Sequence, residues 1–434
     1  MANEHKYQCS FCKRIITVHD QYDMPIFDPT TGFALCKNCI KDIAQMIEAH
    51  DADIAEQGKE GFTETLDDSL KKNKPHVIKQ YLDKYIIKQE HAKKILSVAV
   101  YNHYKRMKYD YDHEKDGDEI EKSNVVMLGP SGCGKTALLS HLSKLLDVPF
   151  AVTDTSSLTE AGYVGSDVEI AVRNLYYAAG SDVEKTEHGI IYLDEFDKIA
   201  RKSGENNSIT ADPGHEGVQQ SLLKMIEGGT VEFTERGQRK HPEAPTIKVN
   251  TKNILFIVGG AFVGIDKIIA KRLQTDSASI GFGADVKGPD EEENYDEIIS
   301  KIQPEDLIKF GIIPEIVGRL PVICTLGTLN EDDLLRILTE PVNAPVKQYE
   351  KLLAMDNVKL VFEDEALRAV AKKAIERKTG ARSLKGIIED SMLDIMFDIP
   401  KSDEPRKVII TKACIEDGSK PLIEPLAEDE TIDK

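Results

Sequence analysis

The sequence predicts an α/β fold in which a doubly wound parallel sheet forms the main body. Uninterrupted apolar runs at residues 125–128, 189–193 and 253–258 have the length and composition of strands that are covered on both faces. Stretches with a helical spacing of apolar residues separate these runs, and such alternation favours parallel strands with helices on both sides. A glycine-rich turn at residues 129–134 follows the first run, as expected where a strand leads into a helix.

Smaller units are expected on both sides of this body. Paired cysteines mark residues 1–50 as a compact zinc-binding module, and the polar stretch at 51–75 is expected to be a flexible linker. The large α/β subdomain is assigned to residues 76–325. Apolar residues recur at helical spacing beyond it, so residues 326–415 are expected to form a small helical subdomain, followed by an acidic tail at 416–434.

The composition argues against several classes of function. The 434 residues include 56 Lys and Arg against 75 Asp and Glu, a formal net charge of −19 that disfavours general binding to nucleic acids or acidic membranes. No apolar run approaches the ~20 residues that a membrane-spanning helix needs. The N-terminal residues have neither the apolar core of a signal peptide nor the composition of a transit peptide, so a cytoplasmic location is expected.

A phosphate-binding motif, G-x-x-x-x-G-K-T, lies between the first apolar run and a helical stretch. Its glycines let backbone N–H groups surround phosphate oxygens, and the following helix adds the positive end of its dipole. Lys135 is expected to contact the β- and γ-phosphates, and the Thr136 hydroxyl to bind Mg²⁺. The alternative, a chance match in a glycine-rich turn, is disfavoured by the flanking patterns. The predicted nucleotide-binding residues are Gly129, Pro130, Ser131, Gly132, Cys133, Gly134, Lys135 and Thr136.

Two adjacent carboxylates, Asp194 and Glu195, end the second apolar run. Because the carboxyl ends of parallel strands share one edge of the sheet, we expect this pair beside the phosphate loop. Neighbouring side chains in an extended chain point in opposite directions, which suggests different roles. Asp194 is predicted to bind Mg²⁺, and Glu195 to be the base that orients the attacking water. The alternative is a pair of solvated acids at a strand end.

Four of the seven cysteines form two C-x-x-C pairs near the N-terminus, Cys9 with Cys12 and Cys36 with Cys39. This pattern is typical of a tetrahedral Cys₄ zinc site, in which the metal replaces the core that so short a segment lacks. Two disulfides are the alternative, and a reducing cytosol disfavours them. The cysteines without such spacing, expected to be buried or incidental thiols, are Cys133, Cys324 and Cys414.

Three segments are distinctive enough to compare with a known family. The carboxylates belong to the segment DEFDKI, and longer motifs occupy residues 216–227 and 307–321. Together with the cysteine module, these segments resemble the ClpX family of AAA+ protein unfoldases over nearly the whole chain. The resemblance implies an ATP- and Mg²⁺-dependent unfoldase and translocase, assembled as a homohexameric ring, that unfolds tagged proteins and delivers them to the ClpP peptidase. It also implies that the zinc module binds adaptor proteins.

The resemblance places further residues at the nucleotide. Arg319 matches the arginine finger that reaches a neighbouring subunit's nucleotide, a task that suits a permanently charged, forked guanidinium. Arg382 matches sensor-2, through which the small subdomain responds to the γ-phosphate. Ile86 and Ile87 stand where the family packs apolar residues against adenine.

The resemblance also assigns three loops that contact proteins. A pore loop that grips polypeptide would include Tyr163 and Val164, whose alternative is a buried tyrosine in a turn. A basic loop at the pore entrance would attract the carboxylate of degradation tags, and a tripeptide in a polar, glycine-rich loop would dock into clefts on ClpP. The residues of the basic loop are Arg239, Lys240 and His241, and those of the tripeptide are Ile280, Gly281 and Phe282.

This chain departs from the family pattern at several positions. Lys88 stands where glycine is usual, Phe196 where isoleucine is usual, and Ala211 and Pro213 are atypical for a second pore loop. No polar sensor-1 residue is evident after the third apolar run. Two other functions stay open: a remodelling chaperone that works without a peptidase, and a nucleic-acid motor, which the net charge of −19 disfavours.

Overall fold

The computed structural model describes residues 5–18, 26–28, 30–31, 33–46, 66–113, 120–158, 167–201, 213–234, 246–278, 295–377, 379–398 and 406–426. The chain divides into two compact units, Met1–Ser69 and Leu70–Lys434. Within the described ranges, no helix combines the length and the apolar character that crossing a membrane requires.

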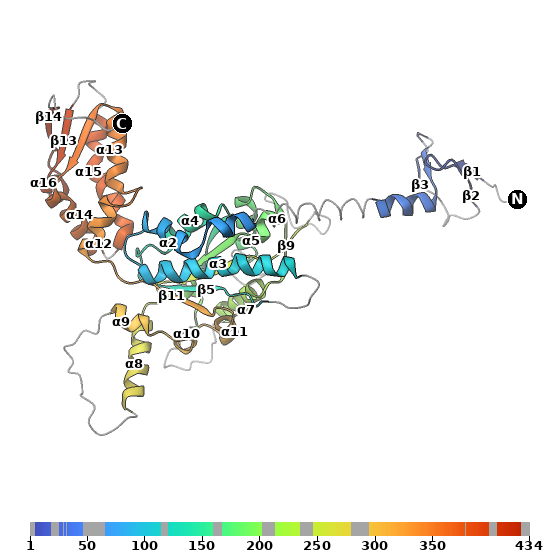
Figure 1. The fold of residues 1–434 in the computed structure, drawn as a ribbon, viewed down its shortest axis with the longest axis horizontal. Helices are drawn as coiled ribbons and strands as arrows, with labels where there is room; N and C mark the ends of the chain where they lie inside the picture. The colour runs from blue at the N-terminus through green and yellow to red at the C-terminus, as the bar shows by residue number, and fades with distance from the viewer. Residues whose placement is uncertain are drawn as a thin grey trace. The chain divides into compact units, whose positions relative to one another are not determined.

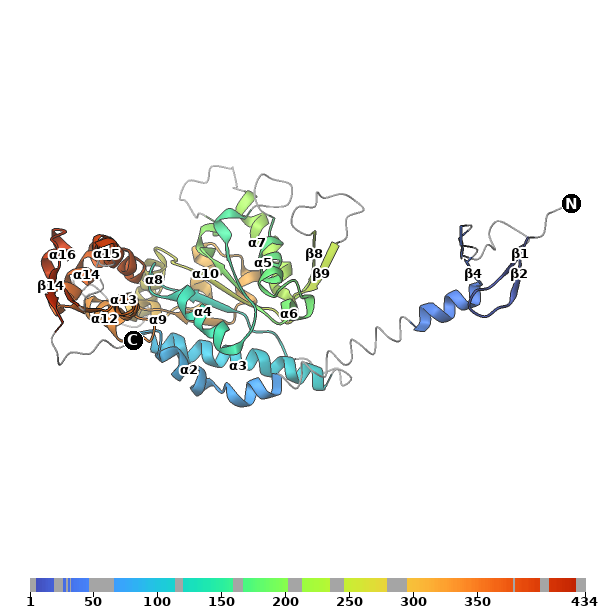
Figure 2. The same ribbon diagram turned by 90° about the horizontal axis from the view of Figure 1, so that it is seen from above.

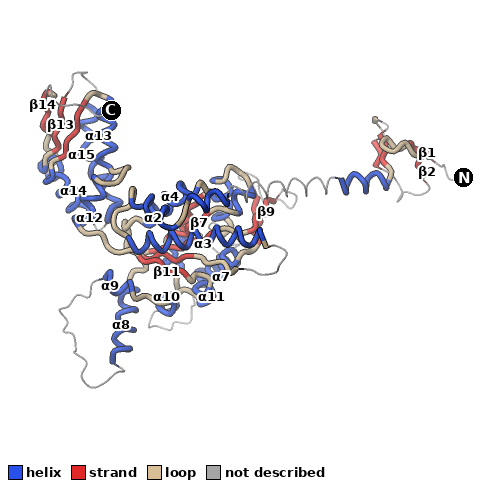
Figure 3. Tube along the Cα trace, in the orientation of Figure 1, coloured by secondary structure: helices blue, strands red, loops and turns tan. Residues whose placement is uncertain are grey.

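The first unit is built from two short hairpins and a helix (Figure 3). Strands β1 (His5–Gln8) and β2 (Ile15–Val18) pair antiparallel, as do β3 (Ile26–Asp28) and β4 (Phe33–Leu35). Residues 37–46 are helical. Such short elements bury little apolar surface, which fits a module that a metal ion stabilises.

The second unit contains the predicted parallel sheet. Five strands are hydrogen-bonded in the order β11-β5-β10-β7-β6, and every pair is parallel. All three apolar runs are confirmed as strands, β5 (Val125–Leu128), β7 (Ile190–Asp194) and β10 (Leu255–Gly260). The structure adds β6 (Phe150–Asp154) and the edge strand β11 (Val322–Thr325).

Helices cover both faces of this sheet, which confirms the doubly wound fold (Figures 1 and 2). Alternate strand residues such as Val126, Ile191 and Phe256 share one core with the helices on one face of the sheet, and the residues between them face the other way. The helices that contribute to this core include α5 (Ile170–Ala178), α7 (Pro213–Glu227), α10 (Pro304–Phe310) and α11 (Pro314–Gly318). The opposite face carries α2 (Pro75–Asp83), α3 (Glu90–Asp112) and α4 (Lys135–Leu146).

Shorter elements complete the large subdomain. The hairpin β8 (Thr230–Thr234) and β9 (Thr246–Asn250) is antiparallel and forms a sheet of its own. The other helices are η2 (Thr155–Ser157), α6 (Val183–Glu187), η3 (Phe196–Ile199), α8 (Ile265–Ala278) and α9 (Tyr295–Ser300).

The small subdomain has its own hydrophobic core, separate from that of the large one. Its helices are α12 (Glu331–Thr339), α13 (Pro345–Met355), α14 (Asp364–Glu376), η4 (Gly380–Ser383), α15 (Leu384–Asp398) and α16 (Lys412–Glu416). A three-stranded sheet, which the sequence analysis did not anticipate, lies beside them. It is formed by β12 (Val358–Phe362), β13 (Arg406–Ile410) and β14 (Leu422–Pro425).

Candidate nucleotide site and zinc module

The phosphate loop connects the end of β5 to the first residue of α4. Gly132 and Gly134 have φ angles of +76° and +102°, in the left-handed region that favours glycine. A Cβ atom on Gly132 would overlap the carbonyl oxygen of Thr379, so a side chain is excluded there on two grounds. Helix α4 begins at Lys135, which directs its free N–H groups toward the loop.

A cavity of about 550 Å³ lies at this loop. It is lined from three directions: by the loop and the first turn of α4, by the ends of β7 and β10, and by η4 of the small subdomain. The lining includes Lys135, Thr136, Asp194, Glu195 and Arg382. The structure therefore brings together five residues that the sequence assigned to ATP and Mg²⁺, and their individual roles stay predictions.

The ammonium group of Lys135 is held against the loop itself. Its Nζ donates hydrogen bonds to the carbonyl oxygens of Gly129 at 2.7 Å and Pro130 at 3.1 Å. An ammonium has three donors, so one remains for a ligand in the cavity. The loop therefore supplies both backbone N–H groups and a fixed positive charge to a bound anion.

Asp194 is oriented by two donors that converge on one of its oxygens. The hydroxyl of Tyr192 and the backbone N–H of Glu195 each donate to Asp194 Oδ1 at 2.9 Å. Burial raises the pKa of Tyr192, which keeps its hydroxyl protonated as a donor. With Oδ1 held in this way, Oδ2 is the oxygen better placed to bind a cation.

Tyr192 itself depends on a glycine at the end of the neighbouring strand. A Cβ atom on Gly259 would overlap the Tyr192 hydroxyl. Sequence reasoning missed both residues as supports of the site, although the unusual Gly259-Gly260 pair after an apolar strand was a visible signal.

Glu195 reaches the cavity because the chain turns sharply at the end of β7. Its φ of +56° is left-handed, which is costly for a residue with a Cβ and breaks the alternation of the strand. Its side chain is exposed, whereas Asp194 is only partly so. An exposed carboxylate that shares a cavity with Lys135 and Thr136 is suited to orient a water molecule.

The small subdomain touches the phosphate loop directly. The backbone N–H of Ala381 donates to the carbonyl oxygen of Gly132 at 3.1 Å. This close approach needs glycine on both sides, since a Cβ on Gly380 would lie 3.1 Å from the same oxygen. Arg382, the next residue of η4, faces the cavity with Ala381. Any movement of the small subdomain would therefore alter the loop.

Arg319 lies apart from this cavity. It follows α11, where its Nε donates to Glu227 Oε1 at 3.1 Å. Both side chains are about half exposed, 54% and 42%, so the pair is accessible from outside the chain. Asn124 fixes the backbone at this position by donating to the Arg319 carbonyl at 3.1 Å.

Ile86 and Ile87 occupy the turn between α2 and α3 and are buried. They do not occur among the residues that line the 550 Å³ cavity or the 170 Å³ cavity on the other side of the loop. The smaller cavity is apolar, with Leu329, Leu334 and Ile375 in its wall. The assignment of the isoleucines to adenine stays a prediction.

The four paired cysteines converge in the first unit. Their sulfur atoms all lie within 4.8 Å of one another, with Cys12 Sγ 3.7 Å from Cys36 Sγ. Burial disfavours the Cys9 thiolate, yet N–H groups aimed at its sulfur lower its pKa to about 6. Burial raises the pKa of Cys39 to about 12, so a thiolate there needs the charge of a cation. The donor set fits Zn²⁺.

Cys36→Ser is therefore expected to abolish tight zinc binding and unfold the described part of the first unit. Structural zinc contributes roughly 10–16 kcal/mol in small modules, more than such short elements supply alone. Metal analysis should find about one zinc per wild-type chain and almost none in the variant, with residues 5–46 losing protection from proteolysis. Cys414→Ser, whose cysteine lies in the second unit, is the matched control. Full zinc content in Cys36→Ser would exclude the Cys₄ site.

The predicted protein-contacting residues lie outside the described ranges. These are Tyr163 and Val164, Arg239, Lys240 and His241, and Ile280, Gly281 and Phe282.

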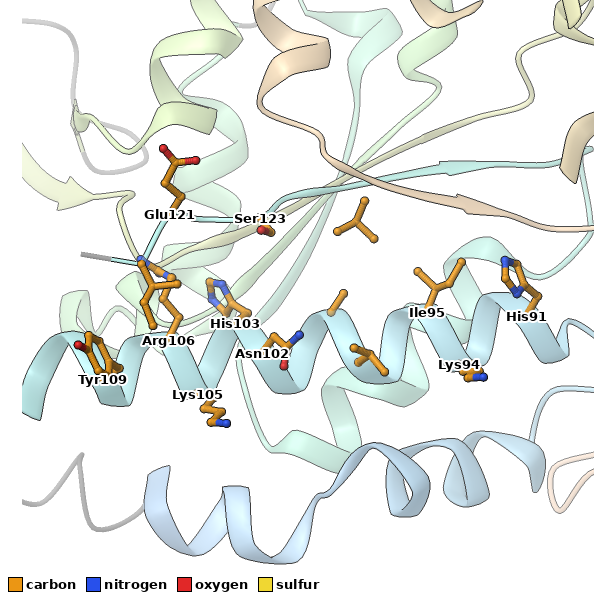
Figure 4. Close-up of a pocket in the computed structure, with 14 residues that line it drawn as sticks. His91, Lys94, Ile95, Asn102, His103, Lys105, Arg106, Tyr109, Glu121 and Ser123 are labelled. Atoms are coloured by element: carbon orange, nitrogen blue, oxygen red, sulfur yellow. The ribbon is translucent and has the colours of Figure 1, made fainter. Parts of the chain in front are cut away.

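A larger cavity of about 620 Å³ follows α3 and shares no lining residue with the first (Figure 4). Ile95, His103 and Arg106 of α3 form part of its wall, with Glu121 and Ser123 across from them. Burial lowers the pKa of His103 well below its usual value, so its ring is neutral. Because no residue of the phosphate loop lines this cavity, we assign the nucleotide to the 550 Å³ cavity.

Comparison with known proteins agrees with this geometry. Residues 120–323 match the AAA domain model (Cdc48 subfamily), and residues 329–410 match the C-terminal, D2-small domain of ClpB protein. The chain is 44% identical over 422 residues to the ATP-dependent Clp protease ATP-binding subunit ClpX of Treponema denticola, covering 97% of each chain.

Proposed function

The chain belongs to the ClpX family of AAA ATPases, and on that premise we propose that it unfolds tagged proteins and delivers them to a ClpP peptidase. An AAA ATPase requires a nucleotide and Mg²⁺. The observation that most supports mechanical output is the hydrogen bond between Ala381 and Gly132. Through it, the phosphate loop and the small subdomain move together, so a change at the nucleotide becomes a rotation of a whole subdomain.

We assign the chemistry of hydrolysis to residues around the 550 Å³ cavity. Lys135 would balance phosphate charge, while Thr136 and Asp194 would hold Mg²⁺, which would offset negative charge on the phosphates. Glu195 orients and deprotonates the attacking water. Arg382 links the γ-phosphate to the small subdomain.

The accessible side chain of Arg319 supports a ring of identical subunits. A guanidinium that completes a neighbour's site requires a head-to-tail interface, and such an interface forms a closed ring when the rotation between subunits closes. We propose a homohexamer whose pore is lined by Tyr163 and Val164, with a basic entrance at residues 239–241. The zinc module would bind adaptor proteins, and we place the protein in the cytoplasm, where reduced thiols can hold zinc.

Degradation of a stable tagged protein tests this proposal. We expect ATP-dependent degradation only when ClpP is present. Phe282→Ala should leave the ATPase rate unchanged but lower degradation at least tenfold, since aromatic anchors dominate such contacts. ATP-dependent unfolding of the same protein with no degradation when ClpP is added would instead identify a remodelling chaperone. ATPase activity that DNA stimulates would identify a nucleic-acid motor.

A further inference from the structure

The turn that joins α2 to α3 has an unusual backbone. Lys88 and Gln89 are consecutive and both left-handed, with φ angles of +58° and +61°. Side chains with a Cβ disfavour this conformation, and two in succession are uncommon. The surroundings must therefore hold the turn in place, and the side chains of these two residues show how they do so.

Gln89 connects the turn to two neighbouring segments. Its amide group exchanges two hydrogen bonds with Gly327, accepting from the backbone N–H at 2.9 Å and donating to the carbonyl at 3.0 Å. It also donates to the carbonyl of Cys133 in the phosphate loop at 3.4 Å. Gly327 belongs to the connector, residues 326–330, which joins the sheet to the small subdomain.

Lys88 extends this connection to the small subdomain. Its Nζ donates to the carbonyl of Thr328 at 2.7 Å and to Asp333 Oδ2 at 3.0 Å, and lies 3.8 Å from Asp296 Oδ2. Asp333 belongs to the first turn of α12 and is 12% exposed, so its charge is only partly solvated. One ammonium thus contacts α9, the connector and α12, all of which are distant from Lys88 in the sequence.

The two carboxylates also hold the backbone of the connector. Asp296 Oδ1 accepts from the Thr328 backbone N–H at 2.8 Å, and Asp333 Oδ2 accepts from the Asn330 backbone N–H at 3.0 Å as part of the α12 cap. Without Lys88, two negative charges would face the same short connector. The ammonium therefore lowers the electrostatic cost of placing both carboxylates beside the connector.

We propose that Lys88 is a positioning residue for nucleotide binding, whose ammonium fixes the connector and α12 relative to the phosphate loop. It acts through Thr328 and Asp333 and is not among the residues that line the 550 Å³ cavity. The inference rests on the proposed nucleotide site at residues 129–136.

Lys88→Met should weaken nucleotide binding without slowing the hydrolysis of ATP that is already bound. If the connector is held correctly only part of the time, the apparent affinity falls in proportion to that fraction. We expect the KM for ATP and the Kd for a fluorescent ADP analogue to rise about fivefold, with kcat changed less than twofold. Loss of folded or assembled protein would instead lower kcat at constant KM.

Two further substitutions separate charge from backbone shape. Lys88→Arg keeps the positive charge and should stay within twofold of wild type, whereas Lys88→Gly relieves the left-handed strain but removes the ammonium. Lys88→Gly should therefore match Lys88→Met. Lys94→Met is the control, because no ion pair of this exposed α3 lysine is found in the part of the chain that the structure describes.

A double-mutant cycle locates the interaction. Asp333→Asn keeps an oxygen that can cap α12 but removes the charge. Lys88→Met should therefore raise the KM for ATP much less in an Asp333→Asn protein than in the wild type. Additive effects, a wild-type KM in Lys88→Gly, or a change in kcat alone would each overturn the inference. Lys135→Ala is measured alongside: if it binds the ADP analogue like wild type, the proposed nucleotide site itself is wrong, whatever Lys88 does.

Discussion

Glu195→Gln is expected to abolish ATP turnover while the protein still binds ATP. Glutamine fills the same space at the end of β7 but cannot accept a proton from the attacking water. General-base catalysis contributes about 10²–10⁴-fold, so kcat should fall by at least two orders of magnitude. Because the side chain is exposed and the turn stays intact, neither folding nor the position of Asp194 should change.

Steady-state hydrolysis and equilibrium binding of an ADP analogue measure the two halves of this prediction. Glu184→Gln, an exposed glutamate of α6, carries the same chemical change outside the cavity and should behave as wild type. If Glu195→Gln lowered kcat by less than tenfold, the base would have to be sought elsewhere. If it lost nucleotide binding as well, Glu195 would be part of the binding site and not only a base.

Most of the predicted residues that the structure places around this cavity have signals that are local in sequence. Lys135 follows a recognisable loop, and Asp194 ends an apolar strand. General rules of parallel sheets then place both residues at the edge where the carboxyl ends of the strands meet. The supports of these residues come from other elements. Tyr192 points at Asp194 only because Gly259, on the adjacent strand, leaves space for it. No pattern within either segment encodes that contact.

The missed strands have a comparable cause. β6, with the sequence FAVTD, has three apolar residues followed by two polar ones and so lacks a regular alternation, and β11 has only four residues. Runs this short do not differ from loops in periodicity, and their pairing with β7 and β5 decides their conformation. The left-handed turn at Lys88 was likewise hidden, because the contacts that hold it come from residues 296–333.

Arg319→Ala is expected to lower ATP hydrolysis by about 10³-fold or more if its guanidinium completes the site of a neighbouring subunit. In the described part of the chain its guanidinium pairs with Glu227, and an exposed pair of this kind stabilises a protein by roughly 0.2–1 kcal/mol. Glu227→Gln breaks the same pair but leaves the guanidinium, so it should retain nearly full activity. Equal losses in both variants would show that the ion pair within the chain is what matters.

Mixing two inactive variants separates an arginine that acts across an interface from one that acts within its own chain. In a ring assembled from Arg319→Ala and Glu195→Gln subunits, an Arg319→Ala subunit keeps its base and can receive the arginine of a Glu195→Gln neighbour. Random assembly at equal amounts creates such complete interfaces at roughly a quarter of positions in a head-to-tail ring. Hydrolysis should therefore recover to about a quarter of the wild-type rate if the sites work independently. An arginine confined to its own subunit predicts no recovery at any ratio, because each chain then lacks one of the two groups.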